Sequence, residues 1–256
     1  MLERRGYLAG DDPRRLAELN DALCDPSARA IVAVRGGYGS TRICHDARFD
    51  ALREHPKWCV GFSDFTALHL EAARVGVASL HAPNLTALGR GDAVARDVWI
   101  DALERPLARR CYSGLAALAP GAANGVLVGG NLTLLFTAAA SGRLTLPDGC
   151  LLFFEEVHEA PYRIDRMLTA LRLSGRLANV AGFCVGDLTG DGQPDTQRRC
   201  EQVVGECLGP LGVPILAGVP VGHGLINQPL PLGVFAHVSA KLGLIINPDA
   251  GETPRA

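Results

Sequence analysis

The sequence predicts an α/β protein whose N-terminal part contains a parallel sheet. Helical and strand-like segments alternate from Pro13 to Val75, an order that implies parallel strands joined by right-handed crossovers. The 30 glycines and 16 prolines among 256 residues imply many tight turns and short loops. A chain of this length is long for one ordinary domain and sufficient for two small ones.

The first elements follow one another in a regular order. Residues 13–23 are predicted to form a helix, because Asp12 and Pro13 are typical of an N-cap and a first helical position, and leucines mark one apolar face. The short apolar run 30–34 is typical of a strand covered on both faces. The glycine-rich turn 35–41 then leads into another predicted helix.

Ser63 lies where the next predicted strand, residues 58–60, becomes a helix. That helix has one apolar stripe, formed by Phe65, Leu68, Ala72 and Val75. A hydroxyl at such a turn can act as a nucleophile, and the free amides of the helix N-terminus can stabilise an oxyanion. The alternative is an ordinary N-cap. The hydrolase motif G-x-S-x-G is absent, since Phe65 replaces its second glycine.

The pattern changes in the middle of the chain. Residues 89–105 are predicted to form one more helix, and beyond Pro106 the sequence weakens into alanine, proline and glycine. We therefore expect an N-terminal α/β domain over residues 1–107, a linker over 108–124 and a C-terminal domain over 125–256.

Strands and helices recur after the linker. The predicted strands lie at residues 125–128, 150–154, 180–186, 234–238 and 242–246, and the predicted helices begin after Asn131, at Pro161 and at Asp195. Asn131 has the side chain of an N-cap, and Gly175 is the expected stop of the helix from Pro161. The second half is therefore expected to contain several short β-segments.

Two further stretches are predicted to carry no site. Residues 187–192 begin like a calcium loop, but Arg198 stands where such a loop needs a bidentate glutamate, so we predict a turn. Residues 251–256 are expected to be a frayed tail.

Composition excludes several classes of function. Lys and Arg number 25 against 27 Asp and Glu, without a basic block, so a nucleic-acid partner is not expected. No apolar run approaches the ~20 residues needed to cross a bilayer, and residues 1–6 show no secretory signal. The eight cysteines form no C-x-x-C pair and no zinc-site spacing with histidine, so we expect no metal and a reducing, cytoplasmic compartment.

The groups that can do chemistry lie on separate turns. Besides Ser63, Glu155 and Glu156 end an apolar strand, and strand alternation sends one to each face. His223 lies in the segment Gly222-His223-Gly224, where flanking glycines allow an imidazole to be aimed. The alternatives are solvated acids at a strand end and a surface-loop histidine.

Other candidates compete with these residues. His81 and His69 are the rival histidines, and His69 follows Ser63 by about 1.7 helical turns, so it is expected to point away from the hydroxyl. The turn 35–39 lacks both the P-loop and the dinucleotide fingerprint. Its backbone amides are nevertheless suited to donate hydrogen bonds to an oxyanion.

Taken together, these segments resemble one known family over nearly the whole chain. The motifs are Gly6-Tyr7-Leu8-Ala9-Gly10, Arg35-Gly36-Gly37-Tyr38-Gly39, Gly61-Phe62-Ser63-Asp64-Phe65-Thr66-Ala67-Leu68-His69, Gly129-Gly130-Asn131-Leu132, Phe154-Glu155-Glu156 with Pro161 to Leu168, and Gly222-His223-Gly224. In this order they are similar to the LD-carboxypeptidases, serine peptidase family S66. Each motif alone is modest, and the ordered set is specific.

The resemblance implies a catalytic triad of Ser63, Glu155 and His223, with the backbone amides of Gly37 and Asp64 as the oxyanion hole and no metal or cofactor. It also implies an N-terminal α/β domain, a β-rich C-terminal domain, a site between them and a homodimer. The implied reaction releases the terminal D-alanine of murein tetrapeptides during cell-wall recycling. A related branch of the family hydrolyses peptidyl-nucleotide antibiotics, and a catalytically inactive peptide-binding module is a third alternative.

One departure from the family pattern affects the expected sheet. Family members carry a strand and a helix before the segment that matches Gly6 to Gly10, whereas this sequence starts almost at that segment. The N-terminal sheet is therefore expected to lack a strand, which leaves an apolar strand unpaired at an edge or in the middle.

Overall fold

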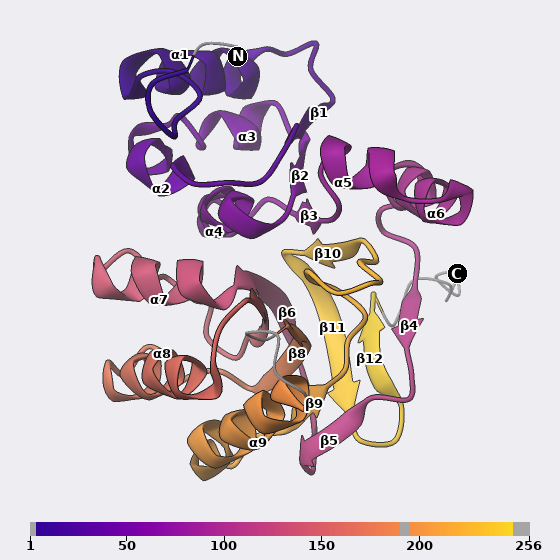
Figure 1. The fold of residues 1–256 in the computed structure, drawn as a ribbon. Coiled ribbons are helices and arrows are strands. Elements are labelled where there is room, and N and C mark those ends of the chain that lie inside the picture. The colour runs from indigo at the N-terminus through magenta and orange to yellow at the C-terminus, as the bar shows by residue number, and fades with distance from the viewer. Residues whose placement is uncertain (1–3, 190–194, 248–256) are drawn as a thin grey trace.

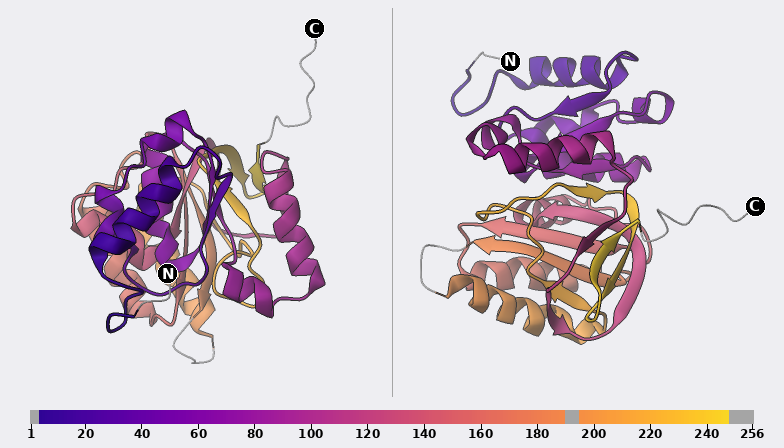
Figure 2. Two further views of the ribbon diagram at one scale, coloured as in Figure 1. Left: turned by 90° about the horizontal axis from the view of Figure 1, so that it is seen from above. Right: turned by 90° about the vertical axis from the view of Figure 1, so that its right-hand side faces the viewer.

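The computed structural model describes residues 4–189 and 195–247 and shows an α/β protein with two sheets (Figure 1). The N-terminal sheet has four strands and the C-terminal sheet has eight. Figure 2 shows the two parts stacked one above the other. The predicted tail, 251–256, and residues 190–192 of the loop 187–192 lie outside the described residues.

The N-terminal sheet is mostly parallel, as predicted. Strands β1 (Ala30–Val32), β2 (Trp58–Gly61) and β3 (Ser79–His81) run in parallel, and β10 (Leu230–Leu232) pairs with β3 in the antiparallel sense. Its helices are α1 (Asp12–Cys24), α2 (Ser40–Ile43), α3 (Ala51–Glu54), α4 (Thr66–Arg74), α5 (Leu85–Arg90) and α6 (Ala93–Glu104), with short 3₁₀ turns η1 (Cys44–Asp46) and η2 (Ser63–Phe65). Among the described residues, the apolar strand β1 stands at one edge of the sheet and is half-exposed.

Both faces of this sheet are covered. On β2, Cys59 packs into a core with residues of α1, α3 and α4, while Val60 faces a second core with Trp99 of α6. This alternation follows from the pleat of the strand. The predicted stripe of α4 is buried in the first of these cores.

Two helix predictions need correction. The N-cap of α1 is Asp11 instead of Asp12, because the Asp11 side chain accepts the amide of Arg14 at 2.9 Å. The predicted helix 89–105 is two helices, α5 and α6. Gly91 ends α5, and the side chain of Asp92 accepts the amide of Ala95 and starts α6.

The C-terminal sheet is mixed and curls into a half-barrel. Its order is β4-β12-β11-β6-β7-β8-β9-β5, in which β6 to β9 run in parallel and the outer strands are antiparallel. The strands are β4 (Arg110–Tyr112), β5 (Ala116–Ala119), β6 (Ala122–Asn131), β7 (Leu151–Val157), β8 (Gly182–Thr189), β9 (Ile215–Ala217), β11 (Val234–Ser239) and β12 (Gly243–Ile246). The predicted α/β fold class is thereby confirmed.

Helices cover one face of this sheet. Figure 1 shows α7 (Leu132–Ala140), α8 (Pro161–Leu173) and α9 (Thr196–Leu208) together on that face; the short turn η3 (Gly209–Leu211) follows α9. The Asn131 side chain caps α7 by accepting the amide of Leu134. In the described residues, no helix is long and apolar enough to cross a membrane.

The segment 108–124 contains β4, β5 and the start of β6, which belong to the C-terminal sheet. Alanine and glycine dominate this segment, so its strands lack the apolar alternation by which strands are recognised. We keep the division into residues 1–107, a linker over 108–124 and residues 125–256 as a proposal, in which the linker contributes these strands to the C-terminal sheet. The strand β10 crosses this division, because it extends the N-terminal sheet.

The two parts meet closely where α4 faces the end of β6. A Cβ atom on Gly130 would lie 2.4 Å from the Thr66 hydroxyl oxygen, so only glycine fits there. That oxygen accepts the amide of Asn131 at 2.9 Å. The close approach brings the Ser63 turn, just before α4, to the carboxyl ends of β6 and β7.

Candidate active site

Ser63 occupies a strained turn between β2 and α4. Its φ angle is +63°, a left-handed conformation that costs a non-glycine residue about 1–3 kcal/mol. Neither η2 nor α4 has a side-chain capping bond at its N-terminus, so Ser63 does not act as the N-cap that the sequence allowed. The side chain is half-buried. A strained serine on a strand–turn–helix is the arrangement of a nucleophile elbow.

The glycine-rich turn 36–39 lies against Ser63. A Cβ atom on Gly36 would lie 3.6 Å from the Ser63 hydroxyl oxygen. The buried carboxylate of Asp64 accepts the amide of Ser40 at 2.8 Å, which ties the end of this turn to the serine turn. Gly37 and Asp64, the predicted oxyanion donors, therefore belong to two turns that one hydrogen bond joins.

Glu155 and His223 form a short hydrogen-bonded pair. The His223 Nδ1 atom lies 2.6 Å from Oε2 of Glu155, which is fully buried near the end of β7. A carboxylate can only accept, so Nδ1 carries the proton when the ring is neutral, and Nε2 is left as the base. The His223 side chain is 16% exposed, so this second nitrogen is not sealed inside the protein.

The pair stabilises its own charges. Burial alone would raise the pKa of Glu155, but the hydrogen bond from His223 and the nearby imidazoles of His223 and His81 outweigh it and lower the pKa to about 2. Burial likewise opposes a charged His223, and the hydrogen bond and charge of Glu155 outweigh it, so the pKa of His223 is raised. Glu155 therefore stays ionised at neutral pH and favours the protonated imidazole.

The segment that carries Ser63 reaches this pair through Phe62. Over residues 4–189 and 195–247, no hydrogen bond joins the Ser63 hydroxyl to His223. Phe62 precedes Ser63, and its ring centroid lies 4.7 Å from that of His223. The serine and histidine segments thus meet, and in substrate-free sites the catalytic hydrogen bonds are often long until a substrate binds.

Space requires a glycine on both sides of His223, and at Gly222 the φ angle of +139° requires it as well. A Cβ atom on Gly224 would lie 2.5 Å from a carboxylate oxygen of Asp187, and one on Gly222 would lie 3.0 Å from Cβ of Glu155. Asp187 also accepts the amide of Gly224 at 2.9 Å. Sequence reasoning placed Asp187 only in a turn. Its position on β8, beside the strand of Glu155, was the available signal.

Glu156 faces the opposite side of β7, as strand alternation predicted. Its carboxylate accepts hydrogen bonds from the Asn131 side chain at 3.0 Å, the Thr133 amide at 2.7 Å and the Val157 amide at 2.9 Å. Burial raises its pKa. Of the two adjacent glutamates, Glu155 is the one that contacts His223.

The rival histidines are both buried. His69 points away from the Ser63 hydroxyl, as predicted, and its ring nitrogens lie 2.9 Å from the Ser79 hydroxyl and 2.9 Å from the Gly61 carbonyl. Burial, with a smaller contribution from His81, lowers its pKa to about 3. His81 is fully buried, and its Nε2 atom lies 3.9 Å from Oε1 of Glu155.

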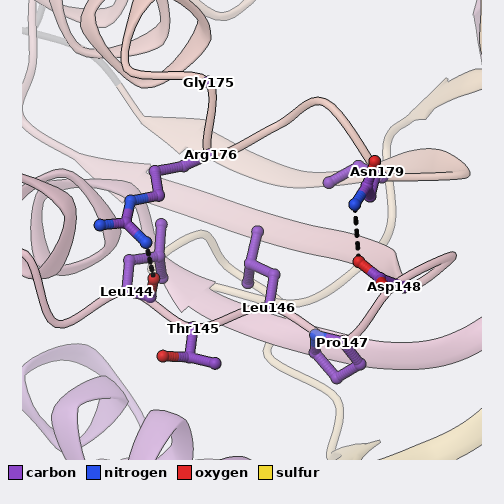
Figure 3. A pocket seen from close by; sticks show the side chains of 9 residues that line it. Leu144, Thr145, Leu146, Pro147, Asp148, Gly175, Arg176 and Asn179 are labelled. Carbon is purple, nitrogen blue, oxygen red and sulfur yellow. Dashed lines mark hydrogen bonds between the residues drawn. The ribbon is translucent and has the colours of Figure 1, made fainter.

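A separate pocket lies at the other end of the C-terminal strands (Figure 3). It is formed by residues 144–148, which precede β7, and by residues 175–180, which precede β8. Two of its polar side chains have partners within the lining, since Arg176 donates to the Leu144 carbonyl and Asn179 to the Asp148 carboxylate. Ligands of parallel sheets bind at the carboxyl ends of the strands, where Glu155 lies. No cluster of three or more metal-binding side chains occurs among the described residues.

Two models of known families match this chain. Residues 1–82 match the model of the LD-carboxypeptidase N-terminal domain, and residues 124–238 match that of the LD-carboxypeptidase C-terminal domain. The first match includes Ser63, and the second includes Glu155 and His223.

Individual relatives are named as carboxypeptidases. The chain is 34% identical over 251 residues to the "Probable murein peptide carboxypeptidase" of Bacillus subtilis, covering 91% of this chain and 76% of that protein. It is 30% identical over 244 residues to the murein tetrapeptide carboxypeptidase of Pseudomonas aeruginosa, covering 91% and 80%. The crystal structure of muramoyltetrapeptide carboxypeptidase from Oxalobacter formigenes matches with a TM-score of 0.81 at 29% identity, covering 95% of this chain and 86% of that one. Sequence and fold together establish that this chain belongs to the LD-carboxypeptidase family of peptidases, S66.

Proposed function

We propose that this protein is a serine-type LD-carboxypeptidase that releases the terminal D-alanine from murein tetrapeptides. The observation that carries the proposal is the 2.6 Å pair of Glu155 and His223 beside a strained serine in a chain of this family. The names of relatives at 30% and 34% identity support murein peptides as the substrate class.

In the proposed mechanism, Ser63 is the nucleophile. His223 Nε2 takes the hydroxyl proton while the serine oxygen bonds to the carbonyl carbon before the terminal D-residue. Glu155 holds the opposite ring nitrogen and stabilises the imidazolium. The carbon–nitrogen bond then breaks, the proton passes from His223 to the departing amine, and water hydrolyses the acyl-enzyme by the same route.

The oxyanion that forms on the carbonyl is proposed to be held by the backbone amides of Gly37 and Asp64. A donor of this kind typically contributes about 3–4 kcal/mol to transition-state stabilisation. The bond from the Ser40 amide to the Asp64 carboxylate supports this assignment, because it keeps the two turns in register.

The proposal includes the setting of the reaction. We place the protein in cell-wall peptide recycling in the cytoplasm, as a homodimer, in line with the resemblance of its motifs. The near balance of 25 basic and 27 acidic residues fits a peptide substrate better than a nucleic acid.

The direct test is incubation of the purified protein with a murein tetrapeptide, with free D-alanine followed by mass spectrometry. We expect release of D-alanine and a tripeptide product, and no release from the same peptide ending in L-alanine. Saturable peptide binding without any D-alanine release contradicts the proposal and favours a binding module. Faster cleavage of a peptidyl-nucleotide in the same mixture favours the antibiotic-hydrolysing branch.

The pH dependence of the reaction follows from the His223–Glu155 pair. The base works only when neutral, so kcat/KM is expected to rise with pH through the pKa of His223. Because that pKa is raised, the rise is expected above the ordinary value of 6.5. Glu155 adds no second step near neutrality, since its pKa is about 2. A pH profile with its midpoint below 6.5 contradicts this prediction.

A further inference from the structure

Glu155 of the proposed triad and the neighbouring His81 both have buried polar atoms without a hydrogen-bond partner among the described residues. Within residues 4–189 and 195–247, Oε1 of Glu155 and both ring nitrogens of His81 are inaccessible and have no hydrogen-bond partner. Leaving a buried polar atom without a partner costs about 1–3 kcal/mol, and more for a charged group, so such atoms in native proteins call for an explanation. Here the unpaired atoms belong to neighbouring side chains.

The unpaired atoms face each other. His81 Nε2 lies 3.9 Å from Oε1 of Glu155, and both side chains are fully buried. This distance exceeds a hydrogen bond by about 1 Å, a gap that a small side-chain shift closes. Oε2, the other oxygen of Glu155, is already taken by His223.

The surroundings leave His81 few other partners. Its ring contacts Phe153 with centroids 5.2 Å apart and Phe62 with centroids 6.1 Å apart, and neither ring accepts a conventional hydrogen bond. Phe153 and Glu155 point to the same face of β7, so packing on the phenyl ring aims the imidazole at the carboxylate. His69, whose centroid is 5.9 Å away, already has partners for both nitrogens.

We propose that His81 is a positioning residue that donates a hydrogen bond from Nε2 to Oε1 of Glu155 and fixes the carboxylate against His223. The proposed chain is then Ser63, His223, Glu155 and His81. A carboxylate held at both oxygens cannot rotate away from the imidazole, so the ring keeps the orientation that catalysis needs. This inference rests on the proposed function, because it assigns a role within the same triad.

The kinetic test compares three variants in the tetrapeptide assay. His81→Phe keeps the ring and removes the donor, so kcat is expected to fall about 10- to 100-fold with KM nearly unchanged. His81→Gln returns an N–H at the position of Nε2, so it is expected to recover most of that loss. His69→Phe is the matched control. It removes an imidazole that is as deeply buried as that of His81 but does not contact Glu155.

A spectroscopic test needs no substrate. In ¹⁵N-histidine NMR of the wild-type protein, Nε2 of His81 is expected to carry a proton, and the strongly deshielded Nδ1 proton of His223 is expected to move in His81→Phe and to stay in His69→Phe. This measurement separates the two proposals. If the wild type releases no D-alanine but these signals appear, the contact stands and the proposed activity fails.

Three results overturn the role of His81. A folded His81→Phe with kcat within about twofold of wild type shows that the donor is not needed. An equal loss in His69→Phe shows that the effect is general destabilisation. An unprotonated Nε2 in wild-type His81 excludes donation to Glu155, and this result remains decisive even if His81→Phe does not fold.

Discussion

Replacing Ser63 by alanine is expected to lower D-alanine release from a murein tetrapeptide about 10⁴- to 10⁶-fold, the range seen when a nucleophile is removed from a serine peptidase triad. The loss is large because no acyl-enzyme can form, and only the oxyanion donors and peptide binding remain to accelerate attack by water. KM or the dissociation constant of the peptide should change little, since the hydroxyl has no bond to His223 before the reaction begins.

The fold of the Ser63→Ala protein should be preserved. The hydroxyl caps neither η2 nor α4, so its removal leaves no amide without a partner. The strained φ angle of +63° is kept by alanine at a similar cost. Thermal unfolding is therefore expected to match the wild type within the error of ordinary surface substitutions, about 0.5 kcal/mol in the free energy of unfolding.

Ser40→Ala is the matched control for this experiment. Ser40 lies on the adjacent turn, and its contact with Asp64 uses the backbone amide, which alanine retains. We expect D-alanine release within a few-fold of wild type. If Ser63→Ala releases D-alanine at the same rate as Ser40→Ala, Ser63 is not the nucleophile. The proposed triad and the proposed acyl-enzyme are then both wrong.

The sequence predicted the elements with strong periodicity and missed those without it. The stripe of α4 and the continuous apolar run of β7 were visible because their side chains that pack into the cores are apolar. The strand β3 went unpredicted, since Ser79 and His81 are polar and only their burial reveals the strand. Likewise β10 is short, contains Pro231, and forms only because β3 offers a free edge.

The candidate site, like the fold, was predicted from the sequence only in part. Ordered motifs located the Ser63, Glu155 and His223 segments, but neither spacing nor composition reveals which of two adjacent glutamates reaches the histidine. That choice depends on which face of β7 is covered by helices, and Glu156 points to the helix side. Asp187 and His81 were missed as neighbours of Glu155, because each comes from a different strand and contact across strands is a property of the folded sheet.

The second large effect is expected for Glu155→Gln, with a loss in kcat of about 10³- to 10⁴-fold. The amide has no charge to stabilise the imidazolium, and its NH₂ group can turn the imidazole into the tautomer whose Nε2 carries the proton and cannot act as a base. The remaining activity should also show a changed pH profile. Glu155 is what raises the pKa of His223 against burial, so its neutralisation should move the rise in kcat/KM to lower pH.

Glu156→Gln separates this catalytic role from the cost of altering a buried carboxylate. The Glu156 carboxylate accepts from three N–H groups, and a glutamine side chain there turns a donor toward them, which should lower the free energy of unfolding by about 1–3 kcal/mol. Its kcat should nevertheless stay near wild type, because Glu156 has no hydrogen bond to His223. The charge of Glu156 contributes less than Glu155 to the raised pKa of His223, so the midpoint of the pH profile should move to lower pH by less than in Glu155→Gln. If Glu156→Gln instead reproduces the pH shift and Glu155→Gln does not, the acid of the triad has been assigned to the wrong face of β7.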